Sequence, residues 1–261
     1  MRLLICAAFM CLWCPLALAE CFATADNSAS KVAGGDGFAS LSLSDGREVR
    51  LADVVPAHAL GKGQNGRMWE RWSAESVFVA RAAGEREADR YGRILGDLLT
   101  GPNRRSLLMQ LLSEGLALVD PTVMSQACLD AMFTVERAAE QQRRGIWRRA
   151  PVRMADDATL SGAAGRYALV EGVVKSIGQT RRTVYLNFGV NYRTDFTVLV
   201  RRRKGEAWRD GLSALEGRRV RVRGVLGAWN GGLIEVEHPR QIETLDRPRA
   251  PLVRTKEPKT R

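Results

Sequence analysis

Histidine is scarce in this 261-residue sequence, which carries only His58 and His238. Imidazole is a principal ligand of protein zinc sites, so a histidine-rich metal centre is excluded. The apolar run from Leu3 to Leu16 is too short to span a bilayer comfortably. Hydrophobic residues nevertheless make up 45% of the chain, enough to bury a sizeable core, so the composition excludes wholesale disorder.

The first 19 residues have the pattern of a secretory signal peptide. Arg2 gives the positive start, the apolar run follows, and Ala17-Leu18-Ala19 supplies a small-x-small cleavage site before Glu20. We therefore expect residues 1–19 to be removed, which leaves a periplasmic or secreted chain with no transmembrane anchor. Retention of this segment as an anchor is the alternative.

Cysteine is equally sparse beyond that segment. Three of the five cysteines lie within it, so the mature chain keeps only Cys21 and Cys128. In an oxidising compartment these two thiols could pair and tie the N-terminus to a later helix. Two separate thiols, with Cys128 buried as a small apolar side chain, fit the sequence equally well.

Positive charge is concentrated in the second half of the chain. Residues 20–157 hold 18 Lys and Arg against 19 Asp and Glu, whereas residues 158–261 hold 21 against 10. The second half should therefore attract a polyanion such as nucleic acid. A basic surface that serves solubility or adhesion to an anionic envelope component is the alternative.

Periodicity predicts a first half that mixes strands and helices. Asp45-Gly46 lies between two stretches of alternating apolar residues, which is typical of a β-hairpin. In chain order, the expected elements are a mobile lead-in over residues 20–34, this hairpin, a helix over 68–83, a strand over 94–99, a helix over 106–114, a strand over 116–119 and an amphipathic helix over 128–142.

Two short motifs lie within this stretch. Asp89-Arg90-Tyr91-Gly92-Arg93 precedes an apolar strand, and Gly145-Ile146-Trp147 follows the last helix. These motifs and the order of elements resemble the staphylococcal nuclease (thermonuclease) family, whose barrel carries Asp-Lys-Tyr-Gly-Arg and whose last helix ends near Asn-Ile-Trp. The resemblance covers residues 35–148 and implies a thermonuclease-like, OB-type five-stranded β-barrel with helices, an α+β domain.

The family hydrolyses phosphodiester bonds with Ca²⁺ on two aspartates, a glutamate base and two arginines that hold the phosphate. By resemblance, Arg50 and Arg93 stand at the two phosphate-binding arginine positions. The second aspartate position holds Val55, and the glutamate position holds His58. By this resemblance the chain keeps the two arginines that hold the phosphate, whereas residues of other types stand at positions of the metal ligand and the base. For the two arginines, the alternative is plain ion pairing with Glu48, Glu87 or Asp89.

Two aspartates remain as candidate Ca²⁺ ligands. The first aspartate position of the family falls at Ala39, with Asp36 nearby. Asp53 lies two residues before Val55, where the alternation of a strand would keep its side chain on the same face. Ca²⁺ takes about six to eight oxygen ligands, so two displaced aspartates supply few of the ligands that it needs. We therefore expect no bound cofactor, or Ca²⁺ if the domain is active.

The last third of the chain is rich in strand patterns. After a polar linker over residues 149–165, residues 166–246 predict five strands with a helix between the third and the fourth, the order of an OB-fold. A basic, proline-containing tail over residues 247–261 is expected to be disordered. The expected strands are 166–174, 183–189, 195–202, 219–225 and 233–236, and the expected helix is 208–215.

One predicted strand of this second domain carries three arginines on one face. Arg219, Arg221 and Arg223 alternate with valines. OB-folds bind single strands through cationic grooves and stacking aromatic rings, so we expect single-stranded DNA or RNA to contact these arginines. Arginines that only face solvent, and rings that only fill the barrel, are the alternative. The candidate stacking residues are Tyr185, Trp229, Tyr192 and Phe196.

The sequence thus leaves three functions open. The first is an exported thermonuclease-like protein that binds nucleic acid and has weak or no phosphodiesterase activity. The second is an active Ca²⁺-dependent nuclease that uses Asp53 or Asp36, with Glu48 as a further candidate, in rearranged roles. The third is a module that binds a protein or an anionic component of the cell envelope.

Overall fold

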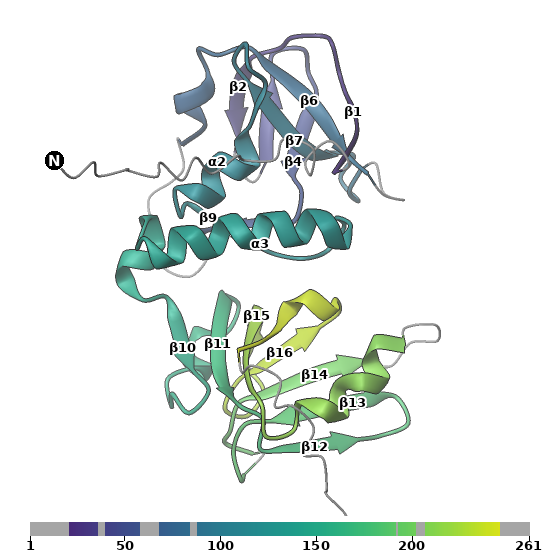
Figure 1. Ribbon diagram of the computed structural model, residues 1–261, viewed down its shortest axis with the longest axis vertical. Helices are drawn as coiled ribbons and strands as arrows, with labels where there is room; N and C mark the ends of the chain where they lie inside the picture. The colour runs from purple at the N-terminus through teal and green to yellow at the C-terminus, as the bar shows by residue number, and fades with distance from the viewer. Residues whose placement is uncertain are drawn as a thin grey trace, which may run out of the picture. The chain divides into compact units, whose positions relative to one another are not determined.

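The computed structural model describes residues 21–35, 40–57, 68–83, 88–191, 193–201 and 207–245. They form two compact units that divide between Arg149 and Ala150, and each unit has its own hydrophobic core (Figure 1). Within the described ranges, no helix has the length and apolar character needed to cross a membrane. The expected signal peptide and the expected basic tail lie outside the described residues.

The first unit is the predicted OB-type barrel. Its main sheet runs in the order β1-β6-β7-β4-β3-β2, with β4 and β7 parallel. β1 pairs with β6, β2 pairs with β3, and Ser30 bridges Val77 between them, so β1 and β2 act as one bent strand that closes the barrel. The bounds are β1 Phe22–Ala25, β2 Val32–Gly35, β3 Ser40–Leu43, β4 Glu48–Leu51, β6 Val77–Ala82 and β7 Ile94–Thr100.

The expectation of a mobile lead-in over residues 20–34 is wrong for the described residues, because β1 and β2 occupy this segment. Cys21 and Val32 are buried in the core of the first unit. A small barrel has no open sheet edge only when its first strand pairs on both sides, and this segment supplies that strand. The sequence pattern did not predict this strand, because its two halves are only four residues long and are separated by polar residues.

The helix expected over residues 68–83 is also wrong. Only a short 3₁₀ helix, η2 (Met68–Trp72), forms there, and the remainder is strand β6. Val77 and Val79 are buried and flank the half-buried Phe78, which is the period of two that a strand requires. Pairing with β7 along its length, and with β1 on its other side, holds this segment extended.

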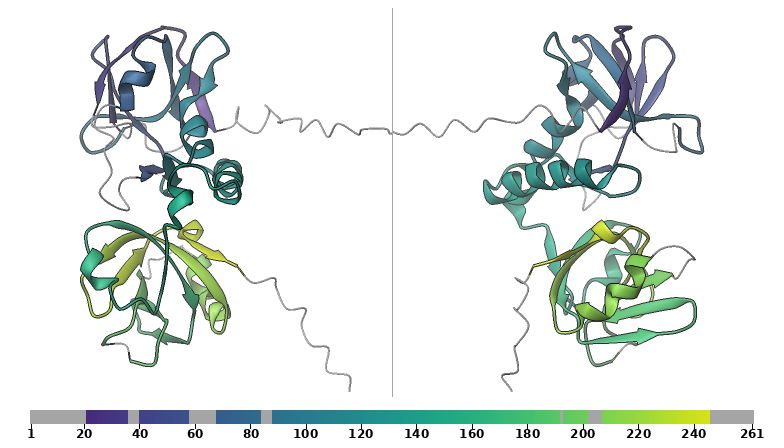
Figure 2. Two further views of the ribbon diagram at one scale, coloured as in Figure 1. Left: turned by 90° about the vertical axis from the view of Figure 1, so that its left-hand side faces the viewer. Right: turned by 45° about the vertical axis from the view of Figure 1, so that its right-hand side comes forward.

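The remaining elements of the first unit follow the predicted order. Ser106 caps helix α2 (Leu107–Ser113), and Ser125 caps helix α3 (Gln126–Gln141). Strand β9 (Ala117–Val119) pairs with β5 (Val54–Pro56) outside the main sheet, and α3 runs beside β9 and α2 (Figures 1 and 2). Strand β8 (Arg105–Ser106) and the 3₁₀ helix η3 (Gly145–Arg149) complete the unit.

A disulfide joins Cys21 to Cys128 in the structure, with the two Cα atoms 5.4 Å apart. Both cysteines are almost fully buried. The bridge links the residue before β1 to the first turn of α3. It therefore holds the barrel-closing strand against the helix. Of the two alternatives for these thiols, a disulfide and two separate thiols, the structure has the disulfide.

The second unit repeats the topology of the first. Its sheet runs in the order β10-β11-β15-β16-β14-β13-β12, with β14 and β16 parallel. β11 pairs with β15 and β12 pairs with β13, and only Val174 and Lys175 separate β11 from β12, so these two form one bent strand. The predicted second OB-fold is therefore present. The bounds are β11 Tyr167–Val173, β12 Ser176–Gln179, β13 Thr183–Asn187, β14 Thr197–Arg201, β15 Arg219–Gly227 and β16 Leu233–Val236.

The segment expected to be a polar linker belongs to the second unit. β10 (Val152–Met154) lies in it and pairs in parallel with β11, and the short helix η4 (Ser161–Ala163) follows. Leu160 is fully buried in the second core. The helix expected over 208–215 is a 3₁₀ helix, η5 (Ala207–Leu215), and β17 (Ile242–Thr244) adds to β15 after the short helix η6 (Pro239–Gln241).

Asp97 is a carboxyl group buried in the first unit. Its Oδ1 accepts hydrogen bonds from the backbone N–H of Leu98 at 2.8 Å and of Leu108 at 2.9 Å, and the Ser106 hydroxyl donates to Oδ2. Burial nevertheless dominates and raises the pKa of Asp97 to about 6. The folded chain therefore keeps the Asp97 proton to a higher pH than the unfolded chain does, although the hydrogen bonds that join this group to β7 and to the start of α2 favour the ionised form.

We predict that removing the disulfide destabilises the first unit. Replacing both Cys21 and Cys128 with serine should lower the free energy of unfolding by about 2–5 kcal/mol, because the bridge closes a long loop. The sequence separation of the two cysteines is 107 residues. Urea unfolding with and without dithiothreitol measures the effect. The double variant should not respond to dithiothreitol, and a wild-type protein of unchanged stability in reductant would contradict the prediction.

We also predict a pH dependence that comes from Asp97. Between about pH 4 and pH 6 the folded chain keeps this proton and the unfolded chain releases it, so the stability contributed by Asp97 falls as pH rises through that window. The total is up to about 3 kcal/mol. In Asp97→Asn this contribution disappears. The difference in unfolding free energy between wild type and variant, measured from pH 4 to 7, should therefore change with pH; a constant difference would refute the prediction.

Candidate functional site

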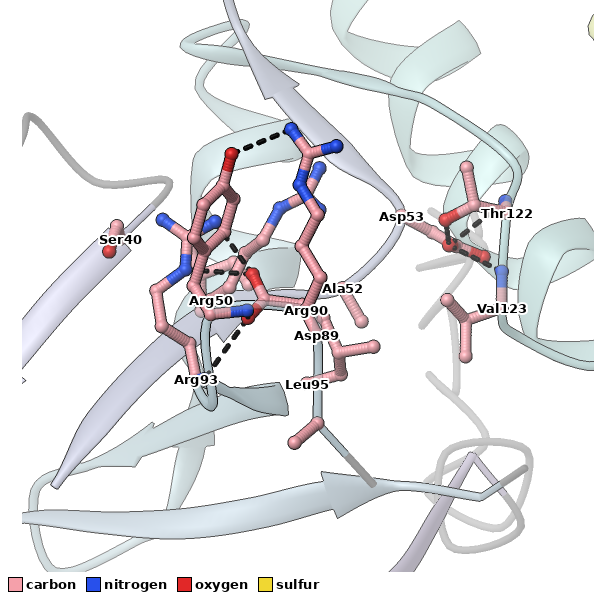
Figure 3. Close-up of a pocket in the computed structure, with 13 residues that line it drawn as sticks. Ser40, Arg50, Ala52, Asp53, Asp89, Arg90, Arg93, Leu95, Thr122 and Val123 are labelled. Carbon is pink, nitrogen blue, oxygen red and sulfur yellow. Dashed lines mark hydrogen bonds and ion pairs between the residues drawn. The ribbon is translucent and has the colours of Figure 1, made fainter. Parts of the chain in front are cut away.

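A pocket of about 880 Å³ opens on the barrel of the first unit (Figure 3). Strand β4 contributes one wall, the turn before β7 a second, and the loop before α3 a third. The polar residues in its lining are Ser40, Arg50, Asp53, Asp89, Arg90, Tyr91, Arg93 and Thr122. Both arginines that the resemblance assigned to phosphate binding therefore line one cavity.

The motif Asp89–Arg93 forms the turn that leads into β7. The backbone N–H of Asp89 donates to the carbonyl of Arg93 at 2.9 Å, and the N–H of Gly92 donates to the carbonyl of Asp89 at 3.0 Å. The Asp89 carboxylate accepts from the backbone N–H groups of Tyr91 and Arg93 at 2.9 and 3.1 Å. Gly92 has φ of +80°, a conformation that side chains disfavour. The aspartate and the glycine of the motif therefore shape the turn.

The Arg93 guanidinium is held by Asp89. Its Nε lies 2.8 Å and its Nη2 2.6 Å from Asp89 Oδ2. Burial by itself raises the pKa of Asp89, but hydrogen bonds from the Arg93 side chain and from two backbone N–H groups outweigh it, so the pKa lies below its usual range. Asp89 is thus ionised at neutral pH and orients Arg93. Arg93 therefore makes the ion pair with Asp89 that was the alternative to phosphate binding, and it also lines the pocket.

Tyr91 projects from this turn beside two arginines. The guanidinium carbons of Arg90 and Arg93 lie 4.7 Å and 5.2 Å from the centroid of its ring. Arg90 Nη2 also donates to the Tyr91 hydroxyl at 2.6 Å. Two-thirds of the tyrosine remains exposed. Sequence reasoning used Arg90 and Tyr91 only as part of a motif, whereas the structure places them in the pocket lining.

Arg50 reaches the same pocket from β4. The parallel pairing of β4 with β7 places Arg50 opposite Leu95, two residues beyond Arg93. Within the described part of the chain, no hydrogen bond or ion pair joins the Arg50 side chain to another residue. Arg50 therefore does not make the ion pair with Glu48 or Asp89 that the sequence left open, and Glu87, the third candidate partner, lies outside the described residues.

Asp53 faces away from these arginines, toward the loop before α3 (Figure 3). Its Oδ1 accepts hydrogen bonds from the N–H of Thr122 at 3.0 Å, the hydroxyl of Thr122 at 2.5 Å and the N–H of Val123 at 2.8 Å. Its Oδ2 accepts from the N–H of Met124 at 2.7 Å. The carboxylate is almost fully buried and accepts four hydrogen bonds, three of them at Oδ1.

The expectation that strand alternation keeps Asp53 on the metal-facing side is wrong. The chain turns at Ala52 and Asp53, between β4 and β5, and Asp53 has φ of +52°. The alternation of a strand therefore ends before this residue. Asp53 acts as the anchor of the loop 122–124 rather than as a metal ligand.

The described residues of the pocket do not fit a Ca²⁺ ion. The two carboxylates in its lining are Asp53, which holds the loop, and Asp89, which holds Arg93. Across the described ranges, no three His, Cys, Asp or Glu side chains converge. A Ca²⁺ site needs several oxygen ligands at once. Asp36, the other predicted ligand, and His58 lie outside the described residues.

The three arginines predicted to bind nucleic acid on β15 are arranged differently from the prediction. Glu171 on β11 accepts from Arg219 Nη2 at 2.9 Å and from Arg221 Nε at 2.8 Å. Arg223 is only 1% exposed. The antiparallel register places Glu171 directly opposite Arg221, and this pairing could not be predicted from either strand alone. β15 therefore does not present a row of three solvated cations.

The candidate stacking residues of the second unit divide into two groups. Tyr185 on β13 and Trp229 in the loop before β16 lie near each other on the surface, with ring centroids 6.5 Å apart. Phe196 is buried against Phe188, so it belongs to the core. Tyr192 lies outside the described residues.

We predict that Asp53 is needed for stability. Asp53→Ala leaves buried N–H groups of the loop 122–124 without acceptors and should lower the free energy of unfolding by about 2–4 kcal/mol. Asp53→Asn should cost less, because it keeps one acceptor oxygen. Chemical denaturation of both variants measures this. A variant as stable as the wild type would show that the carboxylate is not the anchor of this loop.

Comparison with known proteins agrees with this geometry. Residues 64–149 match the family model described as Staphylococcal nuclease homologue. A search of curated proteins finds no match. The matched stretch contains β6, the turn Asp89–Arg93, β7 and the helices α2 and α3. The resemblance noted from the sequence is thereby confirmed over residues 64–149, which carry a domain of the staphylococcal nuclease (thermonuclease) family.

Proposed function

We propose that this protein binds nucleic acid and hydrolyses phosphodiester bonds weakly or not at all. One observation carries the proposal: Arg50 and Arg93 line one pocket, while both carboxylates in its described lining are engaged elsewhere. The guanidinium group presents a planar set of donors that matches phosphate oxygens. Because the first unit contains a nuclease-family domain, we infer that the phosphate belongs to a nucleic acid.

The arginines are arranged to hold a phosphate rather than to cleave an ester. Asp89 fixes Arg93 in place, so little side-chain freedom is lost when an anion binds. Arg50, from the neighbouring strand, supplies the second cation. The exposed ring of Tyr91 lies beside this pair and offers a flat face to a base.

Hydrolysis needs groups that the described pocket does not supply. A water nucleophile requires a general base or a metal ion to activate it. Asp89 has a lowered pKa and is bonded to Arg93 and to two backbone N–H groups, which makes it a weak base. Asp53 is committed to the loop 122–124. Binding without efficient turnover is the function that remains.

The alternative of an active Ca²⁺-dependent nuclease now rests on Asp36 and Glu48, since Asp53 has four hydrogen-bond donors of its own. An envelope module that binds a protein or an anionic component is the further alternative. No contact within the described residues favours either one. Both are outcomes of the assay below.

We further propose that the protein works in the periplasm or outside the cell after removal of residues 1–19. The disulfide between Cys21 and Cys128 supports this, because such bridges persist in oxidising compartments and are rare where thiols are kept reduced.

The test is a combined binding and cleavage assay with the mature chain and labelled single-stranded DNA or RNA. We expect retention at low salt, a steep loss of binding as salt increases, and little or no cleavage in Ca²⁺ beyond that in chelator. Arg50→Ala should weaken binding roughly tenfold, because it removes one charged contact to phosphate.

Arg105→Ala is the matched control, since Arg105 is an exposed arginine of the same unit and does not line this pocket. It should bind almost as the wild type does. Efficient Ca²⁺-dependent cleavage would favour the active nuclease instead. No retention of any polynucleotide at low salt would leave the envelope module.

A further inference from the structure

We propose that the second barrel binds single-stranded nucleic acid across β12, β13 and β14, with Tyr185 and Trp229 stacking on bases and Arg181 and Arg182 contacting phosphates. This rests on the proposed function and names a second site for it, outside the nuclease-family unit. The site differs from the one predicted on β15, whose arginines are engaged by Glu171 or buried. These strands lie side by side in the second unit (Figure 1).

Tyr185 lies on the outer face of these strands. Its neighbours in sequence, Val184 and Leu186, are fully buried, so the alternation of β13 turns Tyr185 outward. Gly178 stands directly opposite it on β12, and a Cβ at that position would lie 3.7 Å from the Tyr185 Cβ. Because glycine has no side chain, β12 leaves that side of the tyrosine open.

Trp229 extends this aromatic surface. It lies in the loop between β15 and β16, is 45% exposed, and tilts 38° from the plane of Tyr185. Two tilted rings at a centroid distance of 6.5 Å leave their outer faces open to two different partners. Leu199 on β14, opposite Tyr185, is partly exposed and adds apolar area. Flat apolar rings at a surface suit unpaired bases, whose faces are accessible only in single strands.

Positive charge lies at one end of the same face. Arg181 and Arg182 are exposed at the tip of the hairpin between β12 and β13, three to four residues from Tyr185. Within the described chain, neither side chain makes a hydrogen bond or an ion pair with another residue. At about 3.3 Å per strand residue, the arginines lie roughly 10 Å from Tyr185 along β13, a spacing that a short stretch of single strand can cover.

The acidic group in register with this face, Glu235, is itself paired with an arginine. Glu235 on β16 lies in register with Leu199 and is on the same face. It pairs with Arg201 on β14, so the two together are neutral. On the β11–β15 side, Glu171 pairs with both Arg219 and Arg221 and so offsets one of their two charges. The face over β12, β13 and β14 therefore combines the partly exposed Tyr185 and the exposed Trp229 with two exposed arginines, the pattern of a single-strand groove.

The experiment measures binding of the mature chain to a dye-labelled oligothymidylate of about 15 nucleotides, within the span of one OB-fold site. Trp229→Ala and Tyr185→Ala should each raise Kd by roughly 5- to 100-fold, the loss expected for one stacked base. Tyr185→Phe keeps the ring and should bind almost as the wild type does. The matched control is Met154→Ala, since Met154 on β10 is also 45% exposed and lies away from these strands.

A second pair of variants tests the cations. Arg181→Ala with Arg182→Ala should weaken binding and flatten the plot of log Kd against log salt by about 0.7 for each phosphate that the protein no longer neutralises. Arg148→Ala with Arg149→Ala removes the same charge from another exposed arginine pair and should leave the slope almost unchanged. Circular dichroism melts of all variants verify that each one folds.

The results of these experiments distinguish failure of the second-barrel site from failure of the proposed nucleic-acid binding on which it rests. If the wild type binds, Arg50→Ala weakens binding, and the Trp229 and Tyr185 variants bind normally, the proposed function stands and the second site is refuted. If the wild type retains no polynucleotide, both fail. Equal loss of single-stranded and duplex binding on removal of the rings would also overturn the stacking role, because duplex bases cannot reach these rings.

Discussion

Closure of each barrel by one bent strand is the constraint on which the rest of the structure depends. In the first unit the two halves of that strand pair with β6 and with β3, and the disulfide holds its start against α3. Closure brings β4 beside β7 in parallel, which places Arg50 next to the turn that carries Arg93. The barrel's strand order thus brings together the two arginines that we propose to hold a phosphate, because they are far apart in the chain.

The carboxylates near these sites organise the chain around them. Asp89 shapes its own turn and orients Arg93, Asp53 anchors the loop before α3, and Glu171 clamps two arginines across β11 and β15. Each is buried or largely buried, and an unpaired charge there would be costly, so none is easily released for metal binding or proton transfer. Because these carboxylates bind arginines and backbone N–H groups, the pocket of this nuclease-family barrel keeps its arginines while its described residues form no metal site.

Two barrels of the same strand order present different surfaces. The first has a pocket lined by the two arginines that we propose to hold a phosphate, with an exposed tyrosine in its lining. The second offers an open sheet face with two rings and a basic hairpin tip. Fold alone does not set these roles, because OB-folds host many ligands; the side chains on particular strand faces do. A chain with both surfaces could contact one nucleic acid at two places, which would raise its overall affinity.

The sequence by itself determined the features that rest on neighbouring residues. The hairpin at Asp45-Gly46, the capped helices, the turn motif Asp89–Arg93 and the five-strand order of the second barrel all follow from local patterns. Only the tertiary structure decided what depends on distant partners. The first strand, β6, the disulfide and the roles of Asp53 and Glu171 belong here: Asp53 bonds residues 69 to 71 positions away, and Glu171 pairs with an arginine 50 positions away. A one-dimensional pattern records which residues are polar or apolar, but strand pairing across the barrel decides which of them meet.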